Sequence, residues 1–104
     1  NQPTIVGDDC VIGHIVHLES CTIANSAQVS SGAIVLHRAE IGSGAIVAAN
    51  SVVLNDTIVP EGALAVGAPA TIKEGRARKA DIEMAALAYL HKGQRFREQL
   101  RRID

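Results

Sequence analysis

The stretch IANSAQVSSGAIVLHRAEIGSGAIVAANSV, residues 23–52, consists of five consecutive units of six residues. Each unit opens with Ile or Val and carries Ala or Ser at its fifth place. The pattern extends from Val6 to Leu64, and its only interruption is LESCT, residues 18–22, which is one residue short. The decisive signal is therefore an internal repeat with a period of six.

This period excludes the two commonest patterns of secondary structure. An amphipathic helix needs apolar residues at spacings of three and four, and a half-buried strand alternates every second residue. One large and one small inward residue in every six fits a strand, a corner and another strand, so that three units make one triangular coil. The sequence therefore predicts an all-β solenoid in which each coil buries its aliphatic layer against its neighbours.

The composition agrees with a core of small aliphatic layers. Tyr89 and Phe96 are the only aromatic residues among the 104, and there is no Trp. Cys10 and Cys21 are too few for a disulfide framework. Because both fall at inward small positions of the repeat, we expect them to be core residues.

Two regions are predicted along the chain. Residues 1–72 form the solenoid, which begins inside the repeat pattern, so coils that precede it are expected to be missing. The motif Gly-Ala-Pro-Ala at 67–70 ends the repeats. Residues 73–104 are predicted to be a linker and a C-terminal α-helix, beginning near Asp81, that packs on the solenoid. An uncovered solenoid end would expose strand edges and requires such a cap.

The charge distribution bears on possible partners. The repeats are acidic, and residues 73–104 are basic, while the net charge of the chain is −1. The basic residues alternate with acidic ones at helical spacing and lack interleaved aromatics, so binding of nucleic acid is not expected. No secretory signal or long apolar run is visible, so we expect a soluble cytoplasmic protein without a membrane segment.

One segment concentrates potential metal ligands, namely GHIVHLESC at residues 13–21. The repeat phase puts His14 outward on the second face of its coil, and it puts Glu19 past a corner on the third face, with His17 just before that corner. His14 and Glu19 of one chain would then not easily bind the same ion. A homotrimer removes the difficulty, because His14 of one subunit would face Glu19 or His17 of the next.

The longer segment VGDDCVIGHIVHLESCTI, residues 6–23, resembles the metal-binding segment of the γ-class carbonic anhydrases, I-G-x-x-x-x-I-G-H-x-x-x-L-H-G-C-T-I. The resemblance rests on Gly7, Gly13, His14, Leu18, Cys21, Thr22 and Ile23. It implies a left-handed parallel β-helix of hexapeptide repeats. It also implies a metal at a trimer interface, held by three histidines from two subunits, with a bound hydroxide that attacks CO2 to give bicarbonate.

The sequence departs from that motif at two ligand positions. The second histidine of the motif is Glu19 here, and His17 appears two residues earlier. A further histidine of the family would precede residue 1. The candidate ligands are therefore His14, His17 and Glu19, binding zinc or alternatively divalent iron or cobalt. Glu19 is also the candidate catalytic residue, as a proton carrier, and His37 is a weaker candidate that would border the site above Ser20.

Three functions remain open from the sequence. The first is a γ-carbonic-anhydrase-like lyase. The second is a coenzyme-A-dependent acyltransferase that uses a histidine as general base between subunits, although the repeats run without the projecting loop that often completes such sites. The third is a non-catalytic trimeric relative with an altered ligand set, for which Glu19 is the best argument.

Overall fold

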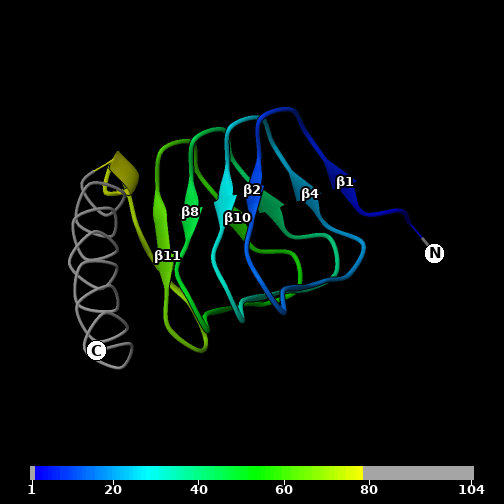
Figure 1. Ribbon diagram of the computed structural model, residues 1–104. Coiled ribbons are helices and arrows are strands. Elements are labelled where there is room, and N and C mark those ends of the chain that lie inside the picture. The colour runs from blue at the N-terminus through cyan, green and yellow to red at the C-terminus, as the bar shows by residue number, and fades with distance from the viewer. Residues whose placement is uncertain (1, 79–104) are drawn as a thin grey trace, which may run out of the picture.

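The computed structural model describes residues 2–78 and shows an all-β chain that winds into a solenoid (Figure 1). The strands are short, with two or three residues each, and corners of three or four residues separate those that form the coils. They are β1 (Ile5–Val6), β2 (Val11–Ile12), β3 (His17–Leu18), β4 (Thr22–Ile23), β5 (Gln28–Val29), β6 (Ile34–Val35), β7 (Glu40–Ile41), β8 (Ile46–Val47), β9 (Val52–Val53), β10 (Ile58–Val59), β11 (Leu64–Val66) and β12 (Thr71–Lys73).

The strands form three sheets, which are the faces of a triangular solenoid. Face A contains β1, β4, β7 and β10; face B contains β2, β5, β8, β11 and β12; face C contains β3, β6 and β9. All neighbouring strands are parallel except β11 and β12, which are antiparallel. The predicted parallel β-helix of hexapeptide repeats is therefore confirmed.

The register records the short unit of the sequence. Ile5 lies opposite Thr22, seventeen residues later, whereas Thr22 lies opposite Glu40, eighteen residues later. The first coil is thus one residue shorter than the second. The missing residue falls in the corner between β3 and β4, which has three residues where the other corners between coil strands have four.

The core consists of inward side chains stacked from coil to coil. On each two-residue strand from the second coil onward, the second residue points inward and is at most 1% exposed, and the small fifth residue of the repeat unit is buried beside it in most units. The inward stacks are Ile23, Ile41 and Val59 on face A; Val29, Val47 and Ala65 on face B; Val35 and Val53 on face C. Full burial of one such aliphatic side chain contributes about 1.5–3 kcal/mol.

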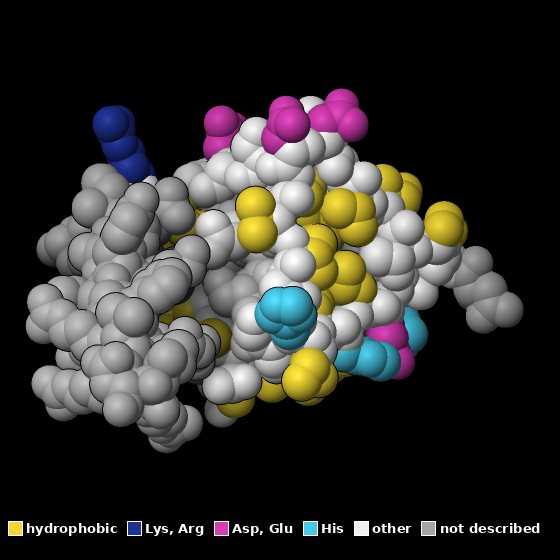
Figure 2. Space-filling view, viewed as in Figure 1, with side chains coloured by type: hydrophobic (Ala, Val, Ile, Leu, Met, Phe, Trp, Pro, Cys, Tyr) yellow, Lys and Arg dark blue, Asp and Glu magenta, His cyan; other side chains and the backbone are white. Residues whose placement is uncertain are grey.

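The first coil differs from the others in its packing. Its inward residues Val6 and Ile12 are 45% and 39% exposed, because no coil among the described residues lies on their outer side. Figure 2 shows the hydrophobic side chains that are consequently visible toward the N-terminal end. The first coil therefore gains only part of the burial that stabilises the coils behind it.

The corners share one backbone conformation. In each four-residue corner between coil strands the third residue has a positive φ, as in Asp9, Ser26, Asn50 and Gly44. In three of these corners, a side chain from the next coil accepts a hydrogen bond from the amide of the residue before it, which is Asp8, His14 or His37. The amide of Asp8, for example, donates to Asn25 Oδ1 at 2.7 Å. The corners are thereby fixed relative to one another along the solenoid.

A turn at residues 67–70 follows β11. After this turn β12 runs back along β11 in the antiparallel sense, and it extends to Lys73, one residue past the predicted boundary. The predicted C-terminal helix, with Tyr89 and Phe96, lies outside the described residues. No helix within residues 2–78 is long and apolar enough to cross a membrane.

Candidate functional site

The segment 13–21 enters face C through one corner and leaves it through another. The first corner contains His14, and strand β3 follows with His17 and Leu18. The short corner comes only after Leu18. The prediction of a corner between His17 and Glu19 is therefore wrong: Leu18 turns toward the core, so His17 and Glu19, two residues apart, both project from the outer side of face C.

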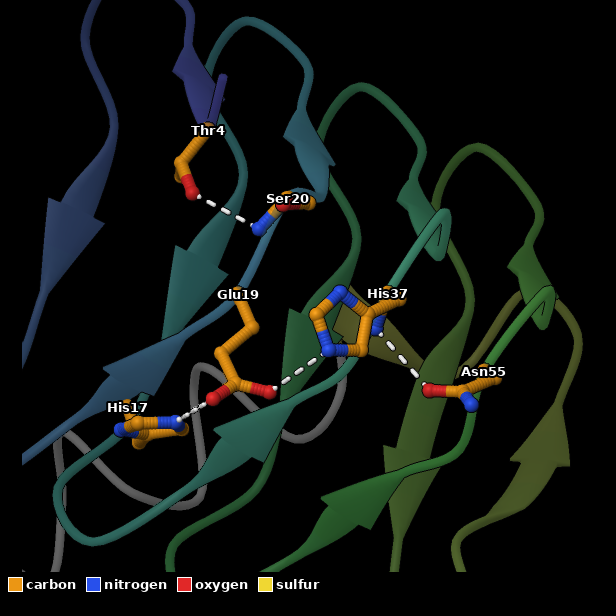
Figure 3. Close-up of polar contacts among 6 residues, drawn as sticks. All are labelled: Thr4, His17, Glu19, Ser20, His37 and Asn55. Carbon is orange, nitrogen blue, oxygen red and sulfur yellow. Dashed lines mark hydrogen bonds and ion pairs between the residues drawn. The ribbon is translucent and has the colours of Figure 1, made fainter. Parts of the chain in front are cut away.

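Three side chains meet on this outer side. The carboxylate of Glu19 lies between two imidazoles, with Oε1 2.9 Å from Nε2 of His17 and Oε2 3.0 Å from Nε2 of His37 (Figure 3). All three side chains are about half exposed. We call His17, Glu19 and His37 the Glu19 cluster. It joins the first coil to the second at the corner between faces C and A.

Backbone contacts fix the positions of the cluster. The amide of Glu19 donates to Val35 O at 3.0 Å, within the ladder between the first two coils. The amide of His37 donates to Asn55 Oδ1 in the third coil, also at 3.0 Å (Figure 3). Ser20, directly after Glu19, donates its amide to Thr4 Oγ1 at 3.0 Å. Glu19 and His37 therefore stand on backbone segments that neighbouring coils hold in place.

The corner of His37 lies next to Ser20 of the preceding coil, since the amide of Arg38 donates to Ser20 O at 2.9 Å, but the contact of His37 with Glu19 was not predicted. The signal was present in the register. A residue of the first coil lies opposite the residue seventeen later, so Leu18 lies opposite Val35. The residues that follow each of them, Glu19 and Leu36, then lie side by side. The long glutamate side chain then reaches the imidazole at the following corner.

The two histidines lower the pKa of the Glu19 carboxyl below its ordinary value of 4.5. The hydrogen bond from His17 is the largest cause, the charges of His17 and His37 add to it, and partial desolvation opposes it. Glu19 is therefore ionised at neutral pH. An exposed carboxylate with imidazoles on both sides can accept a proton or donate oxygen to a cation.

His14 stands apart from the Glu19 cluster. It is exposed at the corner between β2 and β3, where its amide donates to Ser31 Oγ at 3.1 Å. Gly13 permits this corner, since a Cβ there would lie 2.6 Å from the backbone nitrogen of Ser31. Within residues 2–78, no three His, Cys, Asp or Glu side chains are arranged to hold a metal ion. The structure thus brings His17 and Glu19 together but leaves His14 outside their contact.

A pocket of about 290 Å³ lies next to the cluster at the start of face A. Its lining includes Ser20 and Arg38, which directly follow Glu19 and His37 in the sequence. The guanidinium of Arg38 is paired with Asp56, with Nε 2.6 Å from Oδ1, and this pair lowers the pKa of the Asp56 carboxyl. The pocket therefore has a polar wall beside the Glu19 cluster.

Comparison with known families agrees with this architecture. The family model described as bacterial transferase hexapeptide (six repeats) matches residues 20–55, which include most of the second and third coils. In this range the repeats of the chain are therefore similar to those of the bacterial hexapeptide transferases. The match begins at Ser20, so Glu19 lies directly before the matched residues.

The chain is also similar to two curated proteins that are named γ-carbonic anhydrases. It is 37% identical over 68 residues to γ-carbonic anhydrase 2, mitochondrial, from Arabidopsis thaliana. The match includes 65% of this chain but only 24% of the relative, so the chain spans about a quarter of that protein's length.

Solved structures of acyltransferase relatives share the same fold. A putative acetyltransferase from Bacillus cereus matches with a TM-score of 0.65 and 32% identity, over 89% of this chain and 61% of that one. A hexapeptide transferase family protein from Anaplasma phagocytophilum matches with a TM-score of 0.61 and 29% identity, over 88% of this chain and 62% of that one. Some relatives of this hexapeptide-repeat protein are thus named carbonic anhydrases, and others are named transferases.

Proposed function

We propose that this protein is a γ-carbonic-anhydrase-like metalloprotein that hydrates CO2 reversibly at the subunit interfaces of a homotrimer. The observation that supports the proposal best is the Glu19 cluster, in which a carboxylate and two imidazoles meet on an exposed corner. Two of its residues, His17 and Glu19, lie in the segment that resembles the γ-class motif, and a curated relative with 37% identity is named a γ-carbonic anhydrase.

The donor chemistry of the site fits a divalent ion such as zinc, iron or cobalt. Two imidazole nitrogens and one carboxylate oxygen form a known zinc ligand set, with bonds of about 2.0–2.2 Å. Donor atoms at tetrahedral positions around zinc are then about 3.3 Å apart. Nε2 of His17 and Oε1 of Glu19 are 2.9 Å apart and hydrogen-bonded, so an ion would replace the shared proton and the two atoms would move apart by a few tenths of an ångström. His17 and Glu19 would hold the ion together with His14 of another subunit.

His37 suits a supporting role in this proposal. Its Nε2 contacts the carboxylate oxygen that faces away from His17, so it would orient Glu19 in the way that hydrogen-bond partners orient metal ligands. A bound dication lowers the pKa of water to about 7, a magnitude established for carbonic anhydrases themselves, and this activation is what CO2 hydration requires.

The reaction CO2 + H2O → HCO3⁻ + H⁺ also requires a route for the proton. Glu19 is the proposed catalytic residue, because its ionised carboxylate can accept a proton at Oε2 and lies 3.0 Å from Nε2 of His37. The His37 ring is about half exposed, so it can exchange that proton with solvent. Two side chains can pass a proton efficiently when they lie within hydrogen-bond distance of each other.

Coenzyme-A-dependent acyl transfer is the second candidate function. The solved relatives from Bacillus cereus and Anaplasma phagocytophilum carry transferase names. The contact between Glu19 and His37 also suits this chemistry, since a carboxylate that holds an imidazole is a common form of general base. Against it, the connections between coil strands within residues 2–78 are corners of at most four residues, without a projecting loop.

The test combines metal analysis with a CO2 hydration assay on the purified protein. We expect a stoichiometric divalent metal and hydration activity, with both lost in His14→Ala and Glu19→Ala. Glu61→Gln, which changes an exposed carboxylate at another corner, should retain both. Stabilisation by acetyl-CoA in a metal-free protein would favour the transferase instead. The absence of both effects would leave a non-catalytic trimeric relative with an altered ligand set.

A further inference from the structure

The pocket of about 290 Å³ at the start of face A has no part in the proposed reaction. Its lining includes the outward residues of three neighbouring strands, namely Ile5 of β1, Thr22 of β4 and Glu40 of β7. The register places them in one row, because Ile5 lies opposite Thr22 and Thr22 lies opposite Glu40. Paired strands are about 4.8 Å apart, so the Thr22 hydroxyl and the Glu40 carboxylate are neighbours at this pocket.

Glu40 gives this pocket an excess of negative charge. Arg38 also lines the pocket, but its guanidinium donates to both carboxylate oxygens of Asp56, at 2.6 and 3.0 Å. That pair is neutral as a whole. Glu40 is exposed and forms no ion pair with another residue in the range 2–78. Its charge is therefore the one that a ligand in the pocket would meet.

The charge of the surrounding repeats acts in the same direction. Residues 2–72 carry six Asp and Glu residues, and Arg38 is their only Lys or Arg. An excess of one sign of charge raises the local concentration of ligands with the opposite sign. The pocket therefore favours a cationic ligand over an anionic one.

The shape of the lining indicates which kind of cation fits. An ammonium group has three donors and no acceptor, and the Glu40 carboxylate and the hydroxyls of Ser20 and Thr22 all supply acceptor oxygens. Pro3 and Ile5 line the same pocket with aliphatic atoms. A hydrated metal ion gains nothing from such atoms, whereas a short alkyl chain can pack against them.

We propose that this pocket binds a small aliphatic primary amine, with its ammonium group on Glu40 and the neighbouring hydroxyls and its alkyl chain against Pro3 and Ile5. Such amines are protonated at neutral pH, as the lysine side chain is with its pKa of about 10.4. Ser20 directly follows Glu19, so a bound amine would lie beside the Glu19 cluster. The pocket uses none of the candidate metal ligands, and the inference is therefore independent of the proposed function.

The test is a titration of metal-free protein with butylamine hydrochloride at pH 7, followed by the NMR shifts of the backbone amides. We expect saturable shifts at Ser20, Thr22 and Glu40, with a dissociation constant on the order of 1 mM. Added salt should weaken the binding, because the ion pair is exposed. Butan-1-ol has the same chain without the charge and should bind more weakly than the amine.

Glu40→Gln keeps the shape of the side chain and removes its charge. It should raise the dissociation constant for butylamine by about 2- to 5-fold, the usual range for one exposed ion pair. Thr22→Val removes an acceptor oxygen and should have a smaller effect in the same direction. Both positions are exposed on face A, so the two variants should fold.

The matched control is Glu61→Gln, which removes an exposed carboxylate outside the pocket and should bind butylamine like the unaltered chain. An equal loss in Glu61→Gln would show general attraction of cations to the acidic repeats and would overturn the inference. Unchanged affinity in Glu40→Gln, or equal affinity for butylamine and butan-1-ol, would do the same. Because the titration needs no metal, a negative CO2 hydration assay would not alter its result.

Discussion

The first and third coils follow the same path and yet have different environments. In the third coil, the inward residues Ile41, Val47 and Val53 are at most 1% exposed because coils lie on both sides. In the first coil, Val6 and Ile12 occupy equivalent positions and are partly open. His14, His17 and Glu19 of the candidate site belong to the first coil, whereas His37 belongs to the second. The most deeply buried side chains and most of the candidate site residues thus belong to different coils of the solenoid.

The largest expected effect comes from a pair of core substitutions that measures this difference directly. Ile41→Ala should lower the free energy of unfolding by about 2–5 kcal/mol, because it leaves a cavity between two packed coils. Ile12→Ala removes the same atoms from a side chain that is 39% exposed, so it should cost less than half as much. Urea denaturation of both variants gives the two values. Equal losses would mean that the first coil is covered on its outer side in solution.

A pair of glycine substitutions should sharpen the comparison at the corners. A Cβ at Gly42 would lie 2.6 Å from the backbone nitrogen of Glu61, and one at Gly13 would lie equally close to that of Ser31. Gly42→Ala should destabilise the protein by about 1–3 kcal/mol, since both neighbouring coils resist displacement.

Gly13→Ala creates the same clash in the first coil, which can move away from the second coil more easily. Its destabilisation, measured by thermal unfolding, should therefore be smaller than that of Gly42→Ala. A larger loss in Gly13→Ala would show that the first coil is as rigid as the third.

A smaller effect is expected from the charge on Glu19, measured in metal-free protein. Its pKa is lowered in the folded state, so its contacts with His17 and His37 contribute stability above pH 4.5 that is lost as the pH falls through the folded pKa. The urea midpoint of Glu19→Gln should lie below that of the unaltered protein at pH 5–6, and the two should converge toward pH 3. Parallel curves over this range would contradict the pairing.

The smallest effect concerns the rates at which a reagent labels the two free thiols. Burial raises the pKa of the Cys21 thiol, and this side chain is 1% exposed. Cys10 belongs to the first coil and is partly exposed. A thiol reagent at pH 8 should label Cys10 much faster, which the single variants Cys10→Ser and Cys21→Ser would show. Equal labelling rates would indicate frequent opening of the second coil.

Much of the fold could be predicted from the sequence because the inward positions repeat every six residues. Ile23, Val29 and Val35 follow this rule, and so do the small residues between them. The error at His17 and Glu19 has a physical origin. The period shows that one residue is missing from the first coil, but it does not show which side of Leu18 the shortened corner occupies.

Only part of the candidate site could be predicted from the sequence, for a related reason. His14, His17 and Glu19 stand out by residue type and by their resemblance to a motif. The register between coils brings the corners of Glu19 and His37 together, but the contact also depends on the reach of the glutamate side chain, which the spacing of residues does not give.

The seventeen-residue register of the first coil has a wider consequence. Deleting one residue from a corner changes which side chains of that corner lie beside one another, while the strands before and after it keep their pairing. A repeat protein can in this way create a new pair of adjacent surface groups without rebuilding its interior. Such an indel is a route by which a uniform scaffold acquires a local chemical identity.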